Sequence, residues 1–349
     1  MKQKMNLKSG MFNGLPAYAC ALLLLAAGLV LSVLYAVTVG SAELSVGEVY
    51  RVILYELFRW GDPEQLGSGA VHDIVWLIRL PRVVLAVLVG MGLSVVGAVM
   101  QAIVKNPLAD PGIIGISGGA SLTAAAVSAF FPALYFSIPV FAFLGGLAAF
   151  LLIYSLAWKG SLDPVRIILI GIAVAAVFTG AGEVLGGMTN RTGVSVTVSG
   201  LSQLVWSDVQ MMAVYSVAGI AAALILSPAC NLIALDDRTV RGLGVNIDRL
   251  RFLISVAAVL LVSGVTAVVG VISFLALIVP HMARRIVGSD HRILAPFCVL
   301  MGGFVLLLAD TLGRCIAPPN EISASVIMSI VGGPFSILLL KRGDRHAEH

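Results

Sequence analysis

Charged residues are scarce in this chain of 349 residues, since Asp, Glu, Lys and Arg together make up only 11% of it. Soluble domains contain about 25% charged and about 45–50% apolar residues, whereas 59% of this chain is apolar. A surface this poor in charge could not keep the chain dispersed in water. The composition therefore argues against a soluble enzyme or a nucleic-acid-binding protein and indicates a membrane protein.

Cysteine is also rare. The four cysteines, Cys20, Cys230, Cys298 and Cys315, lie in or at the ends of apolar segments and form no Cys-x-x-Cys pair. This pattern argues against a disulfide scaffold or a metal site and favours small buried apolar side chains. The five histidines have no ligand-like partner at helical spacing, so we expect no metal bound by this chain.

Signals for catalysis are missing as well. The chain has no G-x-x-x-x-G-K-[ST] motif for nucleotide phosphates and no H-E-x-x-H motif for zinc. Within its apolar segments, only Glu183 and Asp310 are candidate ionisable groups for an ion pathway. An ion-driven transporter would be expected to carry more such groups, paired near the middle of the bilayer. We therefore expect a protein that is not an enzyme, with no catalytic residues, and whose energy source lies outside this chain.

Long apolar stretches are what the chain does contain. A membrane-spanning helix needs about 20 apolar residues. Nine such windows occur, at Leu15–Val39, Val83–Val104, Ile113–Phe131, Phe136–Trp158, Ile167–Met188, Met211–Ala234, Phe252–Pro280, Ile293–Leu312 and Ala324–Leu340. We interpret the first as a retained span, because it is longer than the 7–15 apolar residues of a signal peptide.

The seventh window is too long for one crossing, and a single crossing would place its cationic flanks on opposite sides of the membrane. A hairpin of two short spans, bending near Gly264–Gly270, removes this conflict and predicts ten spans. With a cytoplasmic N-terminus, sixteen of the 22 Lys and Arg residues then fall on the cytoplasmic side. We therefore expect one all-α membrane domain over residues 1–349, with both termini cytoplasmic.

Two charged segments stand out from the spans. Arg79 and Arg82 lie three residues apart at the outer entrance of the second span, so they can point to one side of a helix. Snorkelling to lipid phosphates and docking to an acidic protein surface explain this spacing equally well.

The second charged segment is the cytoplasmic loop at residues 235–248. Asp236 or Asp237 can cap a short helix there, and Gly242 or Gly244 can end it. The loop is then either an ordinary solvated connection or a lever contacted by a cytoplasmic motor.

At these residues the chain resembles the permease subunits of the bacterial ABC importers for iron-siderophores, haem and cobalamin, the type II importer class. The resemblance rests on these segments: Arg79-Leu80-Pro81-Arg82, Asn106-Pro107-Leu108-Ala109-Asp110-Pro111-Gly112 with Gly115, Leu243-Gly244-Val245, Ile278-Val279-Pro280-His281-Met282-Ala283-Arg284 with Gly288-Ser289-Asp290-His291-Arg292, Leu308-Ala309-Asp310 and Gly333-Pro334-Phe335. It implies about ten transmembrane helices per subunit and a homodimer around a central pathway in the cytoplasmic (inner) membrane. It also implies two cytoplasmic ATPase subunits, which bind ATP and Mg, and an extracytoplasmic substrate-binding protein.

The resemblance also implies roles for particular residues. Binding-protein docking is expected at Arg79, Arg82 and Arg314. Coupling to the ATPase is expected at Asp236, Asp237, Arg238, Arg241, Gly242, Leu243 and Gly244. The cytoplasmic gate is assigned only as a region, Asn106, Pro107, Leu108, Pro164 and Val165, because relatives carry small hydroxyl residues where this chain has Asp163-Pro164-Val165-Arg166.

The function implied is ATP-driven import by alternating access, with a ferric-siderophore as the first expected cargo and haem or cobalamin as alternatives. A self-sufficient, ion-coupled secondary transporter is the competing class of function. Uptake by this chain alone, driven by an ion gradient, distinguishes the two.

Overall fold

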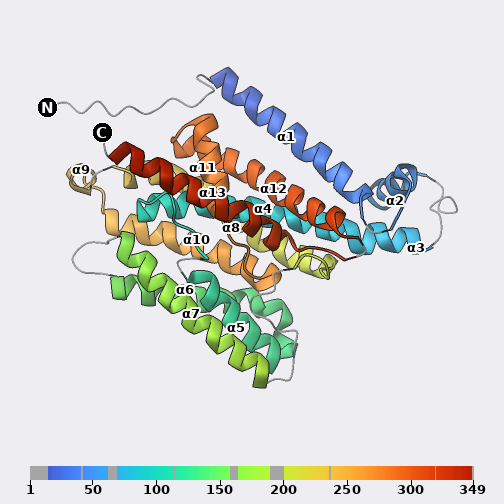
Figure 1. Ribbon diagram of the computed structural model, residues 1–349, viewed down its shortest axis with the longest axis horizontal. Coiled ribbons are helices and arrows are strands. Elements are labelled where there is room, and N and C mark those ends of the chain that lie inside the picture. Colours follow the sequence, from blue (N-terminus) through green and yellow to red (C-terminus); the bar gives the residue numbers. More distant parts are fainter. Residues whose placement is uncertain are drawn as a thin grey trace.

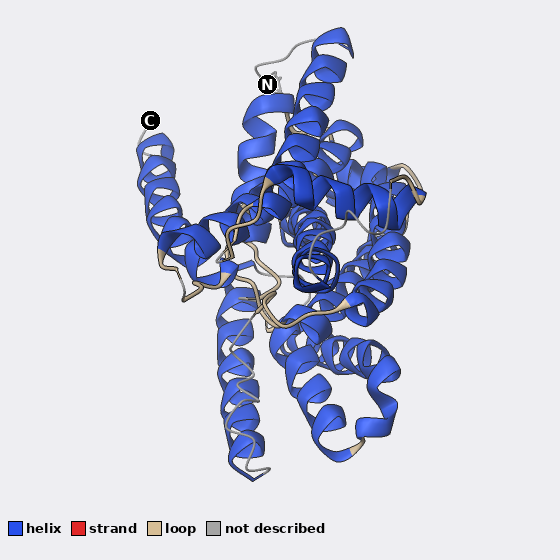
Figure 2. Ribbon diagram, turned by 90° about the vertical axis from the view of Figure 1, so that its right-hand side faces the viewer, coloured by secondary structure: helices blue, strands red, loops and turns tan. Residues whose placement is uncertain are grey.

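The computed structural model describes residues 15–40, 42–61, 69–112, 115–157, 164–188, 200–235, 237–318 and 320–347. Within these ranges the chain is helical and contains no strand (Figure 2). The helices are α1 (Leu15–Thr38), α2 (Val46–Phe58), α3 (Gly69–His72), η2 (Asp73–Arg79), α4 (Leu80–Val104), α5 (Ile116–Phe130), η3 (Pro132–Ser137), α6 (Ile138–Ala157), α7 (Pro164–Met188), α8 (Trp206–Ile233), α9 (Asp237–Gly242), α10 (Ile247–Val269), α11 (Leu275–Val287), α12 (His291–Ile316) and α13 (Ala324–Ala347).

Seven of the described helical segments are long and apolar enough to cross a membrane, and α5 and the apolar part of α13, Ala324–Leu339, add two shorter apolar segments. Eight of the nine apolar windows each correspond to one helix, as the sequence predicts. The short helices α2 and α3 lie at one end of the molecule and α9 lies at the opposite end (Figure 1). We call these the α2 end and the α9 end.

The seventh window divides into α10 and α11, which confirms the predicted break. The chain turns between Gly270 and Phe274, and both residues have positive φ angles, of 79° and 65°. The prediction of two short spans is wrong for α10, which is a full-length helix of 23 residues. Only α11 is short: its 13 residues reach about 20 Å, against a hydrocarbon core of about 30 Å. The total of ten complete crossings stays a prediction.

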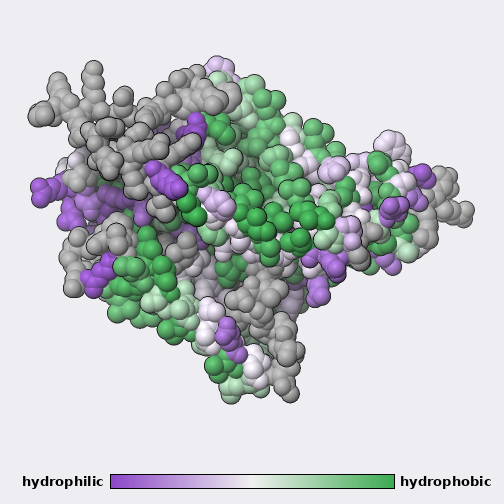
Figure 3. All heavy atoms as spheres, viewed as in Figure 1, coloured by the Kyte–Doolittle hydropathy of each residue, from purple (hydrophilic) through white to green (hydrophobic). Residues whose placement is uncertain are grey.

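Helix α4 forms the centre of the bundle. Of its most apolar window, 78% is buried, compared with 28% for α1 and 17% for α7. It packs against α12, α8, α10 and α11. Helices α5, α6 and α7 form a group on one side, which joins the bundle through contacts of α5 and α6 with α10 (Figure 1). Leucines of α1 such as Leu23 and Leu31 are exposed, and apolar surface covers the middle of the molecule over α12 and α13 (Figure 3). This surface is suited to contact with lipid.

The cysteines follow the same division between core and lipid-facing surface. All four are free, and Cys230 and Cys298 are buried as expected. The expectation is wrong for Cys20 and Cys315, which are exposed on α1 and α12. An apolar thiol has no need of burial inside protein where the surrounding solvent is hydrocarbon.

Close contact between α4 and α12 depends on glycine. A Cβ atom on Gly302 would lie 2.2 Å from the carbonyl oxygen of Gly90 and 2.1 Å from the hydroxyl of Ser94. The Ser94 hydroxyl in turn donates a 2.6 Å hydrogen bond to the Cys298 carbonyl of α12. Small residues let membrane helices approach closely enough for such contacts.

We expect Gly302→Ala to destabilise the protein by about 1–3 kcal/mol, because the backbones of α4 and α12 must separate to admit the methyl group. Gly180→Ala in α7 is the matched control, since a Cβ atom there meets nothing within 4 Å. Thermal unfolding of the detergent-solubilised protein measures both variants. Equal melting temperatures for the two variants would contradict this packing argument.

Candidate coupling and docking sites

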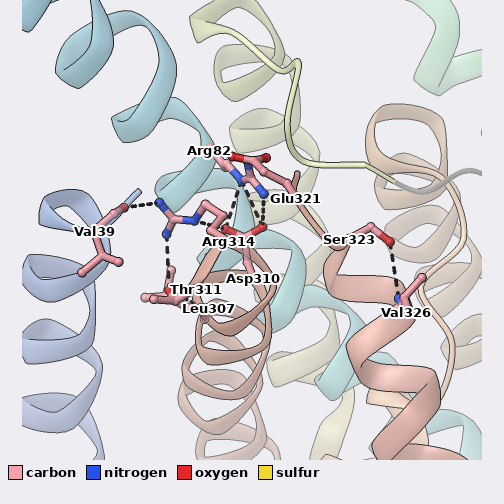
Figure 4. A network of polar contacts seen from close by, with 9 residues as sticks. All are labelled: Val39, Arg82, Leu307, Asp310, Thr311, Arg314, Glu321, Ser323 and Val326. Atoms are coloured by element: carbon pink, nitrogen blue, oxygen red, sulfur yellow. Dashed lines mark hydrogen bonds and ion pairs between the residues drawn. The ribbon is translucent and has the colours of Figure 1, made fainter. Parts of the chain in front are cut away.

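The first candidate site is an arginine cluster at the α2 end, made by Arg82, Asp310, Arg314 and Glu321 (Figure 4). The Arg82 Nε and Nη2 atoms donate hydrogen bonds of 2.9–3.1 Å to the Asp310 carboxylate. Its Nη1 atom donates a 2.5 Å bond to Glu321 Oε2. One guanidinium therefore joins α4 to α12 and to the segment between α12 and α13.

Asp310 pairs with a second arginine on its own helix. The Arg314 Nε atom lies 3.2 Å from Asp310 Oδ2, and the four-residue spacing places both side chains on one face of α12. The Nη1 atom of Arg314 donates to the Val39 carbonyl at 2.9 Å, just beyond the end of α1. Asp310 is fully buried, so its charge is balanced entirely by these partners.

Arg79 contacts different atoms. Its guanidinium donates to the Val37, Thr38 and Ala42 carbonyls at 3.0, 2.8 and 2.5 Å. The last carbonyls of a helix have no intrahelical partner and carry partial negative charge, so a cation there stabilises the end of α1. A Cβ atom at Gly40 would lie 2.9 Å from this guanidinium, so a larger residue there would require the Arg79 side chain to shift.

The three predicted docking arginines are therefore not free surface cations. Arg79, Arg82 and Arg314 are only 5%, 5% and 4% exposed, and each donates to partners within the chain. Arg79 and Arg82 point to different partners rather than to one side. Glu321, whose side chain is 31% exposed, is the member that faces solvent. Sequence reasoning missed Glu321 because it lies in a short connection without helical periodicity. The docking role of the arginines stays a prediction.

The second candidate site is the projecting element at the α9 end, which matches the predicted short helix. Helix α9 ends at Gly242, and Gly244 follows with φ of 77°, a conformation that glycine adopts without strain. Val240 is fully buried and anchors one side of α9, while Leu243 is 64% exposed. Arg238, Arg241, Gly242 and Gly244 are also exposed. Asp236 lies outside the described residues.

Asp237 differs from the rest of this element because its carboxylate turns toward its own chain. Arg251 of α10 donates two hydrogen bonds to it, of 2.8 and 3.0 Å. The Lys105 ammonium donates to Asp237 Oδ1 at 2.9 Å and to the Leu235 carbonyl at 2.8 Å. Hydrogen bonds from Arg251, and then from Lys105, lower the pKa of Asp237 to about 2. Asp237 is therefore ionised throughout the physiological pH range, and the predicted ATPase contact of this side chain stays untested.

The predicted gate region begins next to Lys105. The Asn106 side chain accepts a 2.9 Å bond from the Leu108 amide, and Asp110 accepts a 2.8 Å bond from the Gly112 amide, so the loop through Pro107 is built from local turns. A Cβ atom on Gly115, at the start of α5, would lie 2.9 Å from the Gly171 carbonyl of α7. Pro164 and Val165 open α7, and their side chains lie outside the described residues. The gate assignment stays a prediction.

The helical architecture with these two ends is that of a type II ABC importer permease. The structure is similar to a protein described as a metal-chelate type ABC transporter in an inward-facing conformation, with a TM-score of 0.75, 26% identity and coverage of 93% of this chain and 99% of that chain. It also shares its fold with PsaBC from Streptococcus pneumoniae, with a TM-score of 0.54, 15% identity and coverage of 84% and 95%.

The sequence model of the FecCD transport family matches residues 28–342, and the chain belongs to this family. Among its relatives, the chain is 42% identical over 280 residues to a protein named as the heme-iron transport system permease IsdF of Staphylococcus aureus strain Newman. That alignment covers 80% of this chain and 86% of the relative. The protein is therefore a multi-pass membrane permease of an ABC importer for metal chelates, which confirms the class that the sequence motifs indicate.

We expect Asp310→Asn to destabilise the protein by about 3–5 kcal/mol, because it leaves two buried guanidinium groups without their shared counter-charge. Glu321→Gln is the control, and we expect a smaller loss since Glu321 is partly exposed. Thermal unfolding in detergent compares the two variants. A melting temperature of Asp310→Asn equal to that of the unaltered protein would show that the cluster does not hold the bundle together.

Proposed function

We propose that this chain is the permease subunit of an ATP-driven importer that moves haem across the cytoplasmic membrane by alternating access. The observation that carries the proposal is the 42% identity over 280 residues to a permease named for heme-iron transport. This relative changes the order of cargoes from that expected from the motifs, where a ferric-siderophore came first. A ferric-siderophore is now the alternative cargo, and cobalamin follows it.

The exposed face of α7 supports a pathway shared with a second copy of the chain. The α7 span is only 17% buried, and it carries an exposed ionisable residue, Glu183. An ionisable side chain facing lipid is costly, so such residues usually face a water-filled cavity or another helix. Asp310, the other ionisable candidate, is neutralised by internal ion pairs. A homodimer with α7 at the central pathway accounts for this difference.

Two ATPase subunits supply the energy in this proposal, with ATP and Mg bound by them rather than by the permease. The α9 element offers them the exposed Leu243, Arg238 and Arg241 side chains. A short apolar anchor with flanking arginines is suited to a groove with an acidic rim. This assignment places the α9 end and both termini in the cytoplasm and the α2 end outside.

A substrate-binding protein docks at the α2 end in this proposal. Arg82 of the arginine cluster then exchanges its bond to Glu321 for a bond to the binding protein. Arg82 Nη1 is held by Glu321, which is the partly exposed member of the cluster. A carboxylate of the binding protein takes the place of Glu321 on Arg82, while Asp310 keeps the guanidinium in position. Arg79 and Arg314 support this contact by fixing the end of α1.

Glu321→Gln tests this exchange, because the neutral amide competes less well than a carboxylate for Arg82. We expect the cognate binding protein to bind the variant permease several-fold more tightly than the unaltered permease. Surface plasmon resonance on nanodisc-embedded permease measures this affinity, with the exposed Glu43→Gln substitution as the control. Unchanged or weaker binding to the Glu321 variant would refute the exchange.

Transport itself is tested in proteoliposomes that contain the permease, the cognate ATPase and the binding protein. We expect uptake of haem that requires ATP, with ferric-siderophore and cobalamin tested in parallel. Preference for a ferric-siderophore would overturn the haem assignment and leave the importer class intact. Uptake by the permease alone, driven by an ion gradient and indifferent to ATP, would overturn the importer mechanism.

A further inference from the structure

Helix α9 has only six residues, so its position depends on how it is fastened to the longer helices. Besides the buried Val240 side chain, an exposed ion pair between Arg241 and Asp248 joins α9 to the start of α10. The ion pairs of Asp237 are the described ones that also reach α4. That carboxylate accepts hydrogen bonds from two helices that are far apart in the sequence, through Arg251 of α10 and Lys105 at the end of α4. We call these three residues the α9 link.

The two cations of the α9 link bind differently. The Arg251 side chain is 8% exposed and forms a two-pronged pair with Asp237, which fixes both distance and orientation. Lys105 is 36% exposed and binds as a single point charge. The link therefore holds α9 rigidly to α10 and more loosely to α4. Removal of Asp237 leaves the largely desolvated Arg251 guanidinium without a counter-charge, which is costly.

Lys105 lies at a bend in the backbone. It ends α4 with φ of 54°, in the left-handed region that few side chains adopt, and the chain turns there from the central helix into the loop at residues 106–112. Its ammonium also donates to the Leu235 carbonyl, in the turn between α8 and α9. Because the same ammonium binds Asp237 of α9, a movement of α9 would act directly on the end of α4 and on the start of that loop.

We propose that Asp237 is a positioning residue that fastens α9 to the transmembrane bundle, and that Lys105 and Arg251 transmit the movement of α9 to α4 and α10. This inference rests on the proposed ATP-driven import and deepens it, since it adds Lys105 and Arg251 to the coupling machinery. It also changes the role of Asp237 from a contact with the ATPase to a contact within the permease. The low pKa of Asp237 supports the assignment, because the link stays charged at every pH at which the importer works.

The test measures the ratio of cargo molecules imported to ATP molecules hydrolysed by the reconstituted importer. For Asp237→Asn we expect this ratio to fall several-fold, while the ATPase still binds. Glu43→Gln is the control, because it removes an exposed carboxylate that precedes α2 and lies outside the α9 link. The control should keep the ratio of the unaltered importer.

Lys105 gives a second and milder test, since its exposed amine can be removed with little risk to folding. Lys105→Met should lower the ratio, whereas Lys105→Arg keeps the cation and should restore it. If the three residues act as one unit, combining Lys105→Met with Asp237→Asn should lower the ratio no further than Asp237→Asn alone. A purely structural role would instead lower the amount of assembled complex and leave the ratio unchanged.

The outcomes separate this inference from the proposed function. If the unaltered importer shows no ATP-driven uptake, the proposed function fails, and the link fails with it. If the unaltered importer works and Asp237→Asn assembles with an unchanged ratio, only the link is overturned. If Asp237→Asn does not assemble, Lys105→Met decides, and an unchanged ratio in that variant overturns the link.

Discussion

A carboxylate held between two cations stabilises each end of this molecule, and the arrangement of the bundle depends on these two ion clusters. At the α2 end, Asp310 lies between Arg82 and Arg314. At the α9 end, Asp237 lies between Arg251 and Lys105. Arg82 is at the start of α4 and Lys105 is at its C-terminal cap. The central helix is therefore fixed at both ends by charge, while close glycine contacts hold its middle.

The two clusters differ in burial, and this difference suits them to different tasks. Asp310 and its two arginines have side chains that are 0%, 6% and 3% exposed, so separating them is costly. Asp237 and Lys105 are 39% and 36% exposed, where water and salt weaken ion pairs. The α2 end is thus built to stay in place, whereas α9, held firmly to α10 by Arg251, can shift relative to the end of α4 during a transport cycle at a modest cost.

A permease with one firmly held end and one more exposed end needs no catalytic or nucleotide-binding site of its own to take part in the proposed mechanism. In the proposed mechanism the energy enters at α9, the cargo arrives at the α2 end, and the surface of α7 lines the route between them. Glu321 and Glu183 are then the partly or fully exposed acidic groups through which the permease meets a partner or the pathway. Glu321 follows the end of α12, and Glu183 lies on the exposed face of α7.

The sequence by itself determined the class of protein, the positions of the long helices, the break after α10 and the short helix ended by glycine, because hydrophobic length, glycine and helix caps act locally. Only the tertiary structure decided what the charges do. Arg79, Arg82 and Arg314 were expected to form a cationic docking surface, yet they are buried against carbonyl groups and Asp310. Arg82 and Asp310 are separated by 228 residues, and Lys105 and Asp237 by 132. No local pattern predicts such pairs, since they form only when packing brings distant helix ends together in a medium where a lone charge cannot remain.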